Sequence, residues 1–184
     1  MSSCDFEHLT ETTVGVKQIF EGRIINVHVD DVKLSDGSFS KREVVNHPGG
    51  VGILAKTPEG ELLFVMQFRY PMKKLILEIP AGKLEKGEDP SVCAVRELKE
   101  ETGAECCQPV FLGSFYSSPG FSDEMIYLYY ASVTEMSEAT PDEGEFIECL
   151  RYKVDDVLDM IDTGELIDNK TVTAILLARQ KGFI

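Results

Sequence analysis

Apolar and polar residues alternate along the first part of the chain with the period of two that half-buried β-strands show. Three strand-like segments, VGVKQIF, GRIINVHVDDVKL and SKREVV, lie between Val14 and Val45, and an Asp36-Gly37 turn separates the last two. Residues 1–13 are polar, and we expect them to be mobile. The sequence HPGG of residues 47–50 then breaks the pattern. We therefore predict a small N-terminal antiparallel β-sheet over residues 1–48 and a second domain over residues 49–184.

Strand-like and helical segments are mixed in the second domain. VGILAK and LLFVMQFRY form a predicted hairpin through Pro58-Glu59-Gly60, and LILEIP follows. VFLGSFYS and MIYLYYASV are predicted strands around a loop of residues 117–124, and FIECLRYK is a further strand after the acidic loop TEMSEATPDEGE. Helices are expected near residues 156–162 and 170–181. Strands flanked by helices indicate a mixed α/β architecture, and a chain of 184 residues can bury a core of its own.

The segment GKLEKGEDPSVCAVRELKEETGA, residues 82–104, predicts one more helix with well-defined ends. Asp89 is a typical N-cap and Pro90 suits the first helical position, while Gly103 suits the position just past the C-terminus. The residues at helical spacing that we expect to form its buried face are Val92, Val95, Leu98 and Thr102.

Acidic residues gather on another side of the same helix. Glu97 and Glu101 are four residues apart and stack on one face, with Glu100 beside them. Because like charges at this spacing destabilise an isolated helix, a compensating cation is expected. Carboxylate oxygens bind Mg²⁺, which keeps water molecules that phosphate oxygens can replace. The segment therefore predicts a Mg²⁺ site on a loop–helix unit that serves phosphate chemistry.

Charge limits the classes of partner. The chain has 32 acidic and 18 basic residues, which gives a net charge of −14. A nucleic-acid backbone would repel such a chain, and no basic stripe offsets the repulsion, so we expect no nucleic-acid partner. A small phosphorylated substrate is compatible with this charge, because bound metal ions reverse the local field.

The ends and the cysteines bear on localisation. The N-terminus, MSSCDFEHLTETT, lacks the basic and apolar regions of a signal peptide, and no apolar stretch is long enough for a membrane span. The five cysteines form an odd set without a CxxC pair, as expected of reduced thiols in a cytosolic protein. We therefore expect a cytoplasmic protein with no membrane partner.

The glutamate-rich segment resembles the Nudix box, Gly-x5-Glu-x7-Arg-Glu-U-x-Glu-Glu-x-Gly-U, in which U is a bulky aliphatic residue. Eight of its nine defined places are filled in register, and the ninth holds the smaller Ala104. A merely solvated helix would explain the charge but not the flanking glycines and the arginine. The resemblance implies an α/β/α sandwich with a mixed sheet, and a homodimer formed through the small N-terminal sheet. The matching residues are Gly82, Glu88, Arg96, Glu97, Leu98, Glu100, Glu101 and Gly103.

A second resemblance concerns the subfamily. Pro119 lies sixteen residues beyond Gly103, the offset that marks ADP-ribose pyrophosphatases within the Nudix family. The segment SSPGFSDE resembles their loop with a catalytic glutamate, here Glu124, and QFRYP and LEIPAGKLE are also similar. The implied reaction is Mg²⁺-dependent hydrolysis of ADP-ribose to AMP and ribose 5-phosphate. Two alternatives are a pyrophosphatase for another nucleotide sugar or an oxidised nucleoside diphosphate, and a non-catalytic ADP-ribose sensor, which the intact glutamates disfavour.

The resemblance also implies roles for the acidic residues. Two or three Mg²⁺ ions, with Mn²⁺ as an alternative, would bridge the diphosphate and activate a water molecule. Arg96 would orient the glutamates by ion pairing, and Glu88 would be a structural partner. Glu124 is the expected general base, with Glu100 as the alternative. The implied metal ligands are the backbone carbonyl of Ala81 and the side chains of Glu97, Glu100 and Glu101.

Substrate contacts are expected outside the box. Arg69, at the end of an apolar strand, could clamp a phosphate or form an ordinary surface ion pair. Arg42 and Glu43 reach the adenosine end from the partner subunit if the resemblance holds, and otherwise belong to a polar edge strand. Lys83 and Ser118 flank the metal loop and the catalytic loop and are further candidates.

Overall fold

The computed structural model describes residues 6–184, which form two compact units. The first unit extends to Pro48 and also contains Tyr116–Met125. The second unit contains Gly49–Phe115 and Ile126–Ile184. The loop with Glu124 therefore belongs to the same unit as the N-terminal strands. We had expected it in the second domain, because it lies far from these strands in the sequence.

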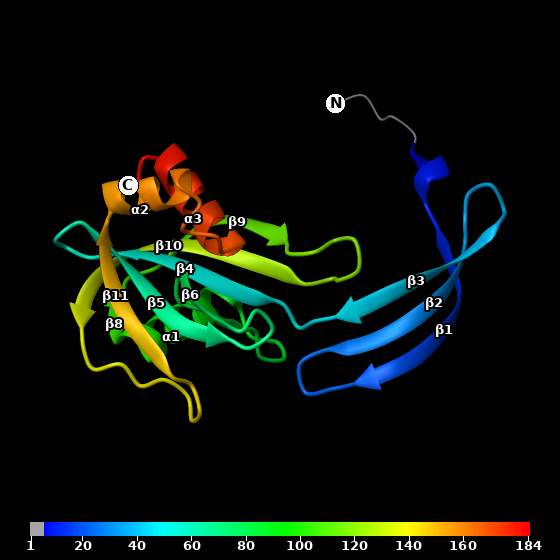
Figure 1. Ribbon diagram of the computed structural model, residues 1–184, viewed down its shortest axis with the longest axis horizontal. Coiled ribbons are helices and arrows are strands. Elements are labelled where there is room, and N and C mark those ends of the chain that lie inside the picture. The colour runs from blue at the N-terminus through cyan, green and yellow to red at the C-terminus, as the bar shows by residue number, and fades with distance from the viewer. Residues whose placement is uncertain (1–5) are drawn as a thin grey trace. The chain divides into compact units, whose positions relative to one another are not determined.

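The first unit is built on a three-stranded antiparallel sheet in the order β1-β2-β3 (Figure 1). Its strands are β1 (Thr12–Glu21), β2 (Asn26–Lys33) and β3 (Phe39–Asn46), and a short 3₁₀ helix, η1 (Glu7–Leu9), precedes them. Gly37 has a φ of 85° in the turn before β3, a conformation that glycine adopts without steric cost. The predicted N-terminal antiparallel sheet is therefore confirmed.

Large apolar side chains of this sheet are exposed. Nine of the ten residues of β1 are exposed, and Val32 on β2 is 4% exposed. A three-stranded sheet needs a packed face to be stable by itself, and this one buries few apolar residues. The large apolar residues of the three strands that are more than half exposed are Val14, Val16, Ile19, Phe20 and Phe39.

The second unit is built on an eight-stranded mixed sheet with the central order β11-β5-β4-β10-β8. Strands β10 and β4 run parallel, and β11, β5 and β6 pair antiparallel. Strand β6 pairs with β5, β7 pairs with β4, and β9 pairs with β10. The strands are β4 (Gly50–Lys56), β5 (Glu61–Arg69), β6 (Lys74–Glu78), β7 (Ala81–Lys83), β8 (Ala104–Cys106), β9 (Val110–Tyr116), β10 (Met125–Met136) and β11 (Ile147–Lys153).

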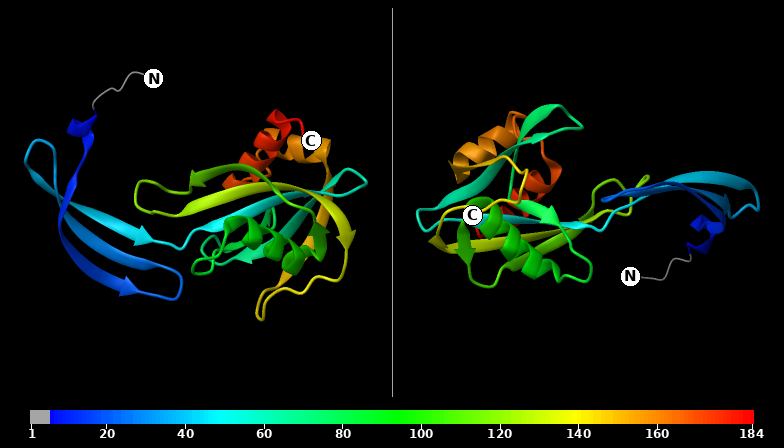
Figure 2. Two further views of the ribbon diagram at one scale, coloured as in Figure 1. Left: turned by 180° about the vertical axis from the view of Figure 1, so that it is seen from behind. Right: turned by 90° about the horizontal axis from the view of Figure 1, so that it is seen from below.

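Helices cover both faces of this sheet (Figures 1 and 2). Helix α1 (Pro90–Thr102) packs on one face, where Ile53 and Leu63 are buried. Helices α2 (Val154–Asp162) and α3 (Asn169–Gln180) pack on the other face, over Leu54 and Phe64. Neighbouring residues of β4 and β5 thus enter opposite cores, which explains why these strands read as continuous apolar runs. The predicted α/β/α sandwich is confirmed.

Two details differ from the sequence prediction. Val92 on α1 is 60% exposed, although Leu98 and Thr102 are buried as predicted. Cys93 and Ala94 take the place of Val92 in the core, because the buried stripe is rotated by about one residue around the helix. Tyr129 and Tyr130 on β10 are buried, but Phe111 on β9 is 51% exposed, so the aromatic residues of these strands are only partly core.

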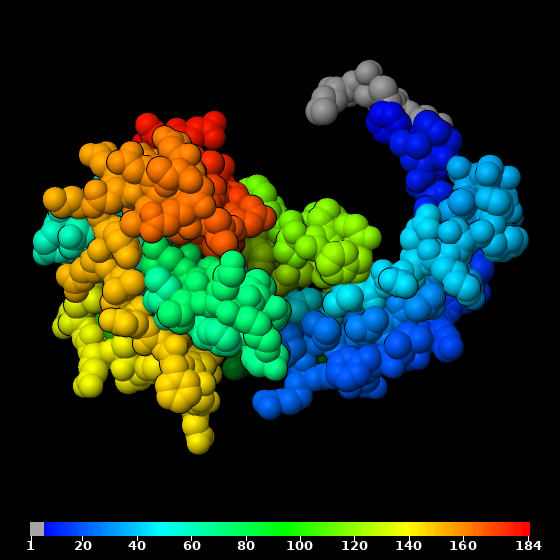
Figure 3. All heavy atoms as spheres, viewed as in Figure 1, coloured from blue at the N-terminus to red at the C-terminus, as the bar shows by residue number. Residues whose placement is uncertain are grey.

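The loop of residues 137–146, which joins β10 to β11, projects from the surface of the second unit (yellow in Figure 3). The side chain of Phe146 at its end is 90% exposed. Among the helices of residues 6–184, none combines the length and the apolar character that a membrane crossing requires.

Candidate functional site

The ends of helix α1 are fixed by local sequence. Asp89 caps the N-terminus by accepting a hydrogen bond from the backbone N–H of Ser91 at 2.8 Å, and Pro90 occupies the first turn. Gly103 ends the helix at a φ of 70°, and a Cβ at this position would lie 2.1 Å from the carbonyl oxygen of Ser137. The predicted helix and both of its caps are confirmed. Because the caps fix where the helix begins and ends, residues outside the acidic cluster determine the positions of its glutamates.

Arg96 lies at the centre of the acidic cluster. Its Nε and Nη2 donate to the two carboxylate oxygens of Glu88 at 3.0 and 3.1 Å. Its Nη1 donates to Glu97 at 2.7 Å and to Glu100 at 2.9 Å. One guanidinium thus holds three carboxylates in fixed positions, which its planar array of donors allows and a lysine ammonium would not.

The contacts of Arg96 change the ionisation of its neighbours. The hydrogen bonds from Arg96 lower the pKa of Glu88 to about 2, so Glu88 is ionised at any physiological pH. Burial raises the pKa of the Cys93 thiol to about 12. Cys93 is therefore protonated near neutral pH and is not a candidate nucleophile.

Glu101 is the most buried carboxylate of this cluster, while the side chains of Glu88 and Glu97 are each 13% exposed. Glu101 is 4% exposed and accepts a hydrogen bond from the backbone N–H of Ala81 at 2.9 Å. Burial, together with the nearby charge of Glu97, raises the pKa of Glu101 to about 8 although the N–H of Ala81 opposes the shift. Burial likewise raises the pKa of Glu97, against the opposing effect of Arg96. The positive groups near these two carboxylates therefore do not offset the effect of burial on their pKa values.

Gly82 makes room for this arrangement. A Cβ added to Gly82 would lie 1.9 Å from the carboxylate carbon of Glu97, so any side chain here would displace that carboxylate. The glycine lets the backbone of β7 approach the carboxylate closely, and Ala81 next to it contacts Glu101. The structure thus brings four of the predicted residues, Ala81, Glu97, Glu100 and Glu101, together with Arg96.

The donor set has the chemistry of a site for a hard divalent cation. Three carboxylates contact one guanidinium and Glu101 binds the backbone N–H of Ala81, so the cluster is short of positive charge. Within residues 6–184, no three His, Cys, Asp or Glu side chains form a preassembled metal site. The contacts give a reason, because Arg96 holds Glu97 and Glu100 while Ala81 holds Glu101. The residues fit a divalent cation by donor type and by their unbalanced charge.

Glu145 adds to the negative charge and was not predicted. Its charge raises the pKa of both Glu97 and Glu101. It lies in the loop of residues 137–146, which contacts α1 through a hydrogen bond from the N–H of Thr140 to the carbonyl of Glu100 at 2.9 Å. Nothing in the sequence distinguishes Glu145 from the other acidic residues of this loop.

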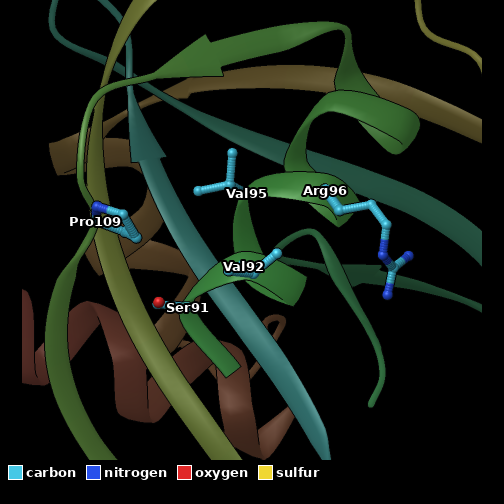
Figure 4. Close-up of a pocket in the computed structure, with 5 residues that line it drawn as sticks. All are labelled: Ser91, Val92, Val95, Arg96 and Pro109. Atoms are coloured by element: carbon cyan, nitrogen blue, oxygen red, sulfur yellow. The ribbon is translucent and has the colours of Figure 1, made fainter. Parts of the chain in front are cut away.

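The outer side of α1 has a different character. Ser91, Val92, Val95, Arg96 and Pro109 line a shallow hollow there. Figure 4 shows the guanidinium of Arg96 extending away from Pro109. The hollow holds none of the glutamates, and Arg96 is the residue that it shares with the acidic site.

A second charged network holds the strand that leads into the acidic site. Arg69 donates to both carboxylate oxygens of Glu78 at 2.7 Å, and Lys170 also pairs with Glu78. Glu78 is 1% exposed, and burial alone would raise its pKa, but the hydrogen bonds and charges of Arg69 and Lys170 bring the pKa below its ordinary value. Arg69, a predicted substrate ligand, is thus engaged in a partly buried ion pair.

The N-terminus of α3 extends this network. The hydroxyl of Thr171 accepts a hydrogen bond from the backbone N–H of Ile79 at 2.9 Å and donates to Asp168, the N-cap of α3. Ile79 lies two residues before Ala81, so α3 helps to hold the backbone that enters the acidic site. The contacts of Thr171 and Lys170 were not predicted from the sequence. The available signal was Asp168, which has the residue type and spacing of an N-cap.

Glu124 lies in the loop of the first unit. Its Oε2 accepts a hydrogen bond from the hydroxyl of Ser117 at 2.5 Å, and its Oε1 lies 3.2 Å from Nδ1 of His47. The loop is attached to β3, because the N–H of Val45 donates to the carbonyl of Phe121 at 2.8 Å. The carbonyl of Ser118, another predicted substrate ligand, accepts the N–H groups of Phe121 and Ser122 within this loop.

The remaining predicted substrate ligands lie on strands. Arg42 on β3 pairs with Glu11, from Nε to Oε2 at 2.9 Å and from Nη2 to Oε1 at 2.5 Å. Glu43 follows it and is exposed, and successive strand residues project to opposite faces of the sheet. Arg42 and Glu43 therefore project from opposite faces of β3. Lys83 is exposed at the end of β7.

Comparisons with known proteins agree with this architecture. A NUDIX domain matches residues 46–175, and a nucleoside diphosphate sugar hydrolase N-terminal domain matches residues 11–45. The chain is 50% identical over 167 residues to a Bacillus methanolicus protein named methanol dehydrogenase activator, with 90% of each chain covered. It is 45% identical over 169 residues to an ADP-ribose pyrophosphatase of Bacillus subtilis strain 168, with 91% of each covered.

A more distant relative has another named substrate. A GDP-mannose pyrophosphatase of Escherichia coli strain K12 is 34% identical over 154 residues, which cover 77% of this chain and 80% of the relative. The resemblance drawn from the glutamate-rich segment is confirmed, since the matched NUDIX domain spans both that segment and the sandwich. With more than half of its residues inside that domain, the protein belongs to the Nudix family.

Proposed function

We propose that the protein hydrolyses the diphosphate bond of ADP-ribose and releases AMP and ribose 5-phosphate. The observation that carries the proposal is the similarity, over 91% of the chain, to a Bacillus subtilis protein named ADP-ribose pyrophosphatase. The acidic cluster around Arg96 supports it, because a relative that had lost the activity would be free to lose these glutamates, and all of them are present. A small nucleotide substrate also suits a chain with a net charge of −14 when cations screen the site.

The cofactor in this proposal is Mg²⁺, with Mn²⁺ as a substitute and two or three ions at the site. When bound, such ions neutralise the diphosphate oxygens and make a water molecule more acidic. The carboxylates of Glu97, Glu100 and Glu101 and the carbonyl of Ala81 would hold them. The high pKa of Glu101 fits this role, since a buried carboxylate without a cation retains its proton.

The other residues of the chain bind, orient and move a proton. Glu124 is the proposed general base and accepts a proton from the attacking water as the new P–O bond forms and the P–O bond of the anhydride breaks. Arg96 keeps the carboxylates of α1 in place through its ion pairs. The proposed substrate contacts are Arg69, Lys83 and Ser118, with Arg42 and Glu43 supplied by the partner subunit.

A substrate panel tests the proposal. Purified protein with Mg²⁺ is given ADP-ribose, GDP-mannose, other nucleotide sugars, nucleoside diphosphates and nucleoside triphosphates, and the products are identified by chromatography and mass spectrometry. We expect the highest kcat/KM with ADP-ribose, and AMP and ribose 5-phosphate in equal amounts. A higher kcat/KM for GDP-mannose would favour a pyrophosphatase for other nucleotide sugars, which the Escherichia coli relative makes the second candidate. Tight binding of ADP-ribose without turnover would indicate a sensor.

A third candidate follows from the Bacillus methanolicus relative, which is named an activator of methanol dehydrogenase. The chain could raise the activity of an alcohol dehydrogenase of the same kind. The test is the rate of methanol oxidation by that dehydrogenase with and without the chain. An increase that persists in the Glu124→Gln variant would show a role independent of hydrolysis.

The proposed assembly is a homodimer formed through the N-terminal sheet of residues 1–48. The exposed apolar residues of β1 support it, since Val16 and Phe20 are 64% and 54% exposed in a sheet that buries little by itself. Sedimentation of the wild-type protein and of the Val16→Glu variant tests it. We expect a dimer for the wild type and a monomer for the variant, and a wild-type monomer would contradict the proposal.

A further inference from the structure

His47 is the last residue before Pro48, where the first unit ends, and it faces Glu124. Its Nδ1 lies 3.2 Å from Oε1 of Glu124, while the hydroxyl of Ser117 donates to Oε2 at 2.5 Å. The side chain of His47 is 13% exposed and that of Glu124 is 28% exposed. The carboxylate therefore has a hydroxyl donor on one oxygen and an imidazole nitrogen within hydrogen-bond distance of the other.

Asp123 fixes the backbone that carries His47. One oxygen of Asp123 accepts the backbone N–H of His47 at 2.8 Å, and the other accepts the side-chain amide N–H of Asn46 at 2.8 Å. The loop residue before Glu124 thus binds the residue that contacts Glu124, which closes a ring of interactions between β3 and the loop. Pro48 adds a further restriction, because the residue before a proline favours an extended backbone.

The same ring continues into the sheet. Asn46 lies 3.0 Å from Nε2 of His28 through its Oδ1, and Nδ1 of His28 lies 2.6 Å from Asp30. Asp30 is 9% exposed, so this part of the network is buried. The position of His47 is therefore coupled to β2 and β3 through side-chain contacts as well as through the chain itself.

Two donors on a carboxylate fix the direction in which its remaining lone pairs point. A carboxylate only accepts hydrogen bonds, so Nδ1 of His47 can bind Glu124 only in a form that carries a hydrogen on that nitrogen. The two oxygens offer about four lone-pair sites, and Ser117 and His47 take one on each oxygen. A lone pair on each oxygen is still available for a proton from water. A general base must also lie within hydrogen-bond distance of that water, which an unrestrained loop carboxylate reaches only part of the time.

We propose that His47 is a positioning residue for the general base and that, together with Ser117, it holds the Glu124 carboxylate in its catalytic orientation. This inference rests on the proposed function, in which Glu124 is the base. His47 touches neither substrate nor metal in this role and acts only through Glu124.

A double-mutant cycle tests this role. The kcat and KM for ADP-ribose are measured for the wild type, His47→Phe, His47→Asn, Glu124→Gln and the double variant His47→Phe/Glu124→Gln. Phenylalanine fills the space without a donor, whereas the side-chain amide of asparagine can place an N–H near the position of Nδ1. We expect His47→Phe to lower kcat by about tenfold, as the loss of one hydrogen bond to a charged group does, with KM within about twofold of the wild type.

The cycle separates positioning from a structural effect. His47→Asn should recover kcat to within about twofold of the wild type, and His47→Phe should cost almost nothing in the Glu124→Gln background. An equal loss in both backgrounds, or His47→Asn as slow as His47→Phe, would overturn the proposal. If His47→Phe does not fold by circular dichroism, Ser117→Ala and Ser117→Thr replace it in the same cycle, because they remove and keep the other donor.

Failure of the proposed function gives a different result. It appears as a wild-type protein that does not hydrolyse ADP-ribose, or as a Glu124→Gln variant with normal turnover. By contrast, a normal His47→Phe variant beside a slow Glu124→Gln variant leaves the proposed function intact and refutes the role of His47 alone.

Discussion

The carboxylates of helix α1 and the carboxylate of Glu124 are held in different ways. Glu97 and Glu100 on α1 and Glu88 just before it contact one guanidinium, and the helix itself is fixed by an aspartate cap and a glycine. Glu124 lies in a loop, where a serine hydroxyl and a histidine hold it. The first set is a charged cluster on a rigid element, and the second is a single carboxylate on a segment that depends on tertiary contacts.

The difference explains how each set can serve its proposed role. Metal ligands must lie at constant distances from one another, and a helix turn provides such distances. A base needs one correctly directed oxygen, so it can lie on a loop that is attached to β3. In this proposal, the carboxylates of α1 bind the cations and Glu124 on the loop transfers the proton.

Removing a metal-ligand candidate should have the largest effect. We expect Glu97→Gln and Glu101→Gln each to lower kcat/KM for ADP-ribose by about 10³-fold, because several kcal/mol of transition-state stabilisation would be lost. Glu105→Gln is the control, since Glu105 pairs with Lys99 and is exposed. If Glu101→Gln kept more than a tenth of wild-type activity in a steady-state assay, α1 would not be the metal platform.

Removing the base should have the next largest effect and a different kinetic signature. We expect Glu124→Gln to lower kcat by about 10²-fold or more while KM changes by less than about threefold, because the substrate still binds. Glu21→Gln is the control, as an exposed carboxylate on β1 in the same unit. A rise in KM with unchanged kcat would place Glu124 among the binding residues.

Replacing the central arginine should have an intermediate effect. Arg96→Lys keeps the charge but cannot reproduce the donors to Glu88, Glu97 and Glu100, so we expect kcat to fall by about tenfold. The concentration of Mg²⁺ for half-maximal rate should rise as well. Arg179→Lys on α3 is the control, since Arg179 is exposed. An Arg96→Lys variant with wild-type kinetics would mean that charge alone positions the carboxylates.

The pH dependence of stability should show the smallest effect. Glu101 has a pKa of about 8 in the folded protein against an ordinary value of 4.5, so between these values the folded form keeps a proton that the unfolded form releases. Stability without divalent cations should therefore fall as pH rises from 5 to 8, by roughly 5 °C in Tm. Glu88 has a lowered pKa of about 2 and contributes nothing in this window.

The matched measurement uses Glu101→Gln in EDTA. A glutamine does not titrate, so the variant should show a flatter dependence of Tm on pH than the wild type. The same slope in both proteins would show that Glu101 is ionised without a cation.

Much of the fold was readable from sequence because its signals are local. The turn at Asp36-Gly37, the cap at Asp89 and the end at Gly103 each depend on a few neighbouring residues. The orientation of α1 was less accessible, because Val92 and Cys93 are both acceptable core residues and only packing against the sheet decides between them. Strand β8 is three residues long and has no distinct alternation, so it was not predicted.

In the candidate site too, features with a local signal were predicted and contacts that depend on tertiary structure were not. The glutamates of α1 have fixed spacing on one helix, so the sequence predicted their clustering. The contact between Glu78 and Lys170 joins residues 92 positions apart. The contact between His47 and Glu124 joins two segments that residues 49–115 separate in the sequence. Such contacts depend on tertiary structure, and the sequence offered no spacing from which to infer them.

Binding of Mn²⁺ in the absence of substrate tests the division of roles most directly. Electron paramagnetic resonance gives the affinity for Mn²⁺ of the wild type, Glu101→Gln and Glu124→Gln. We expect Glu124→Gln to bind Mn²⁺ with wild-type affinity, although it has lost turnover, and Glu101→Gln to bind it at least about tenfold more weakly. Equal affinity of Glu101→Gln and the wild type, or an equal loss in both variants, would contradict it.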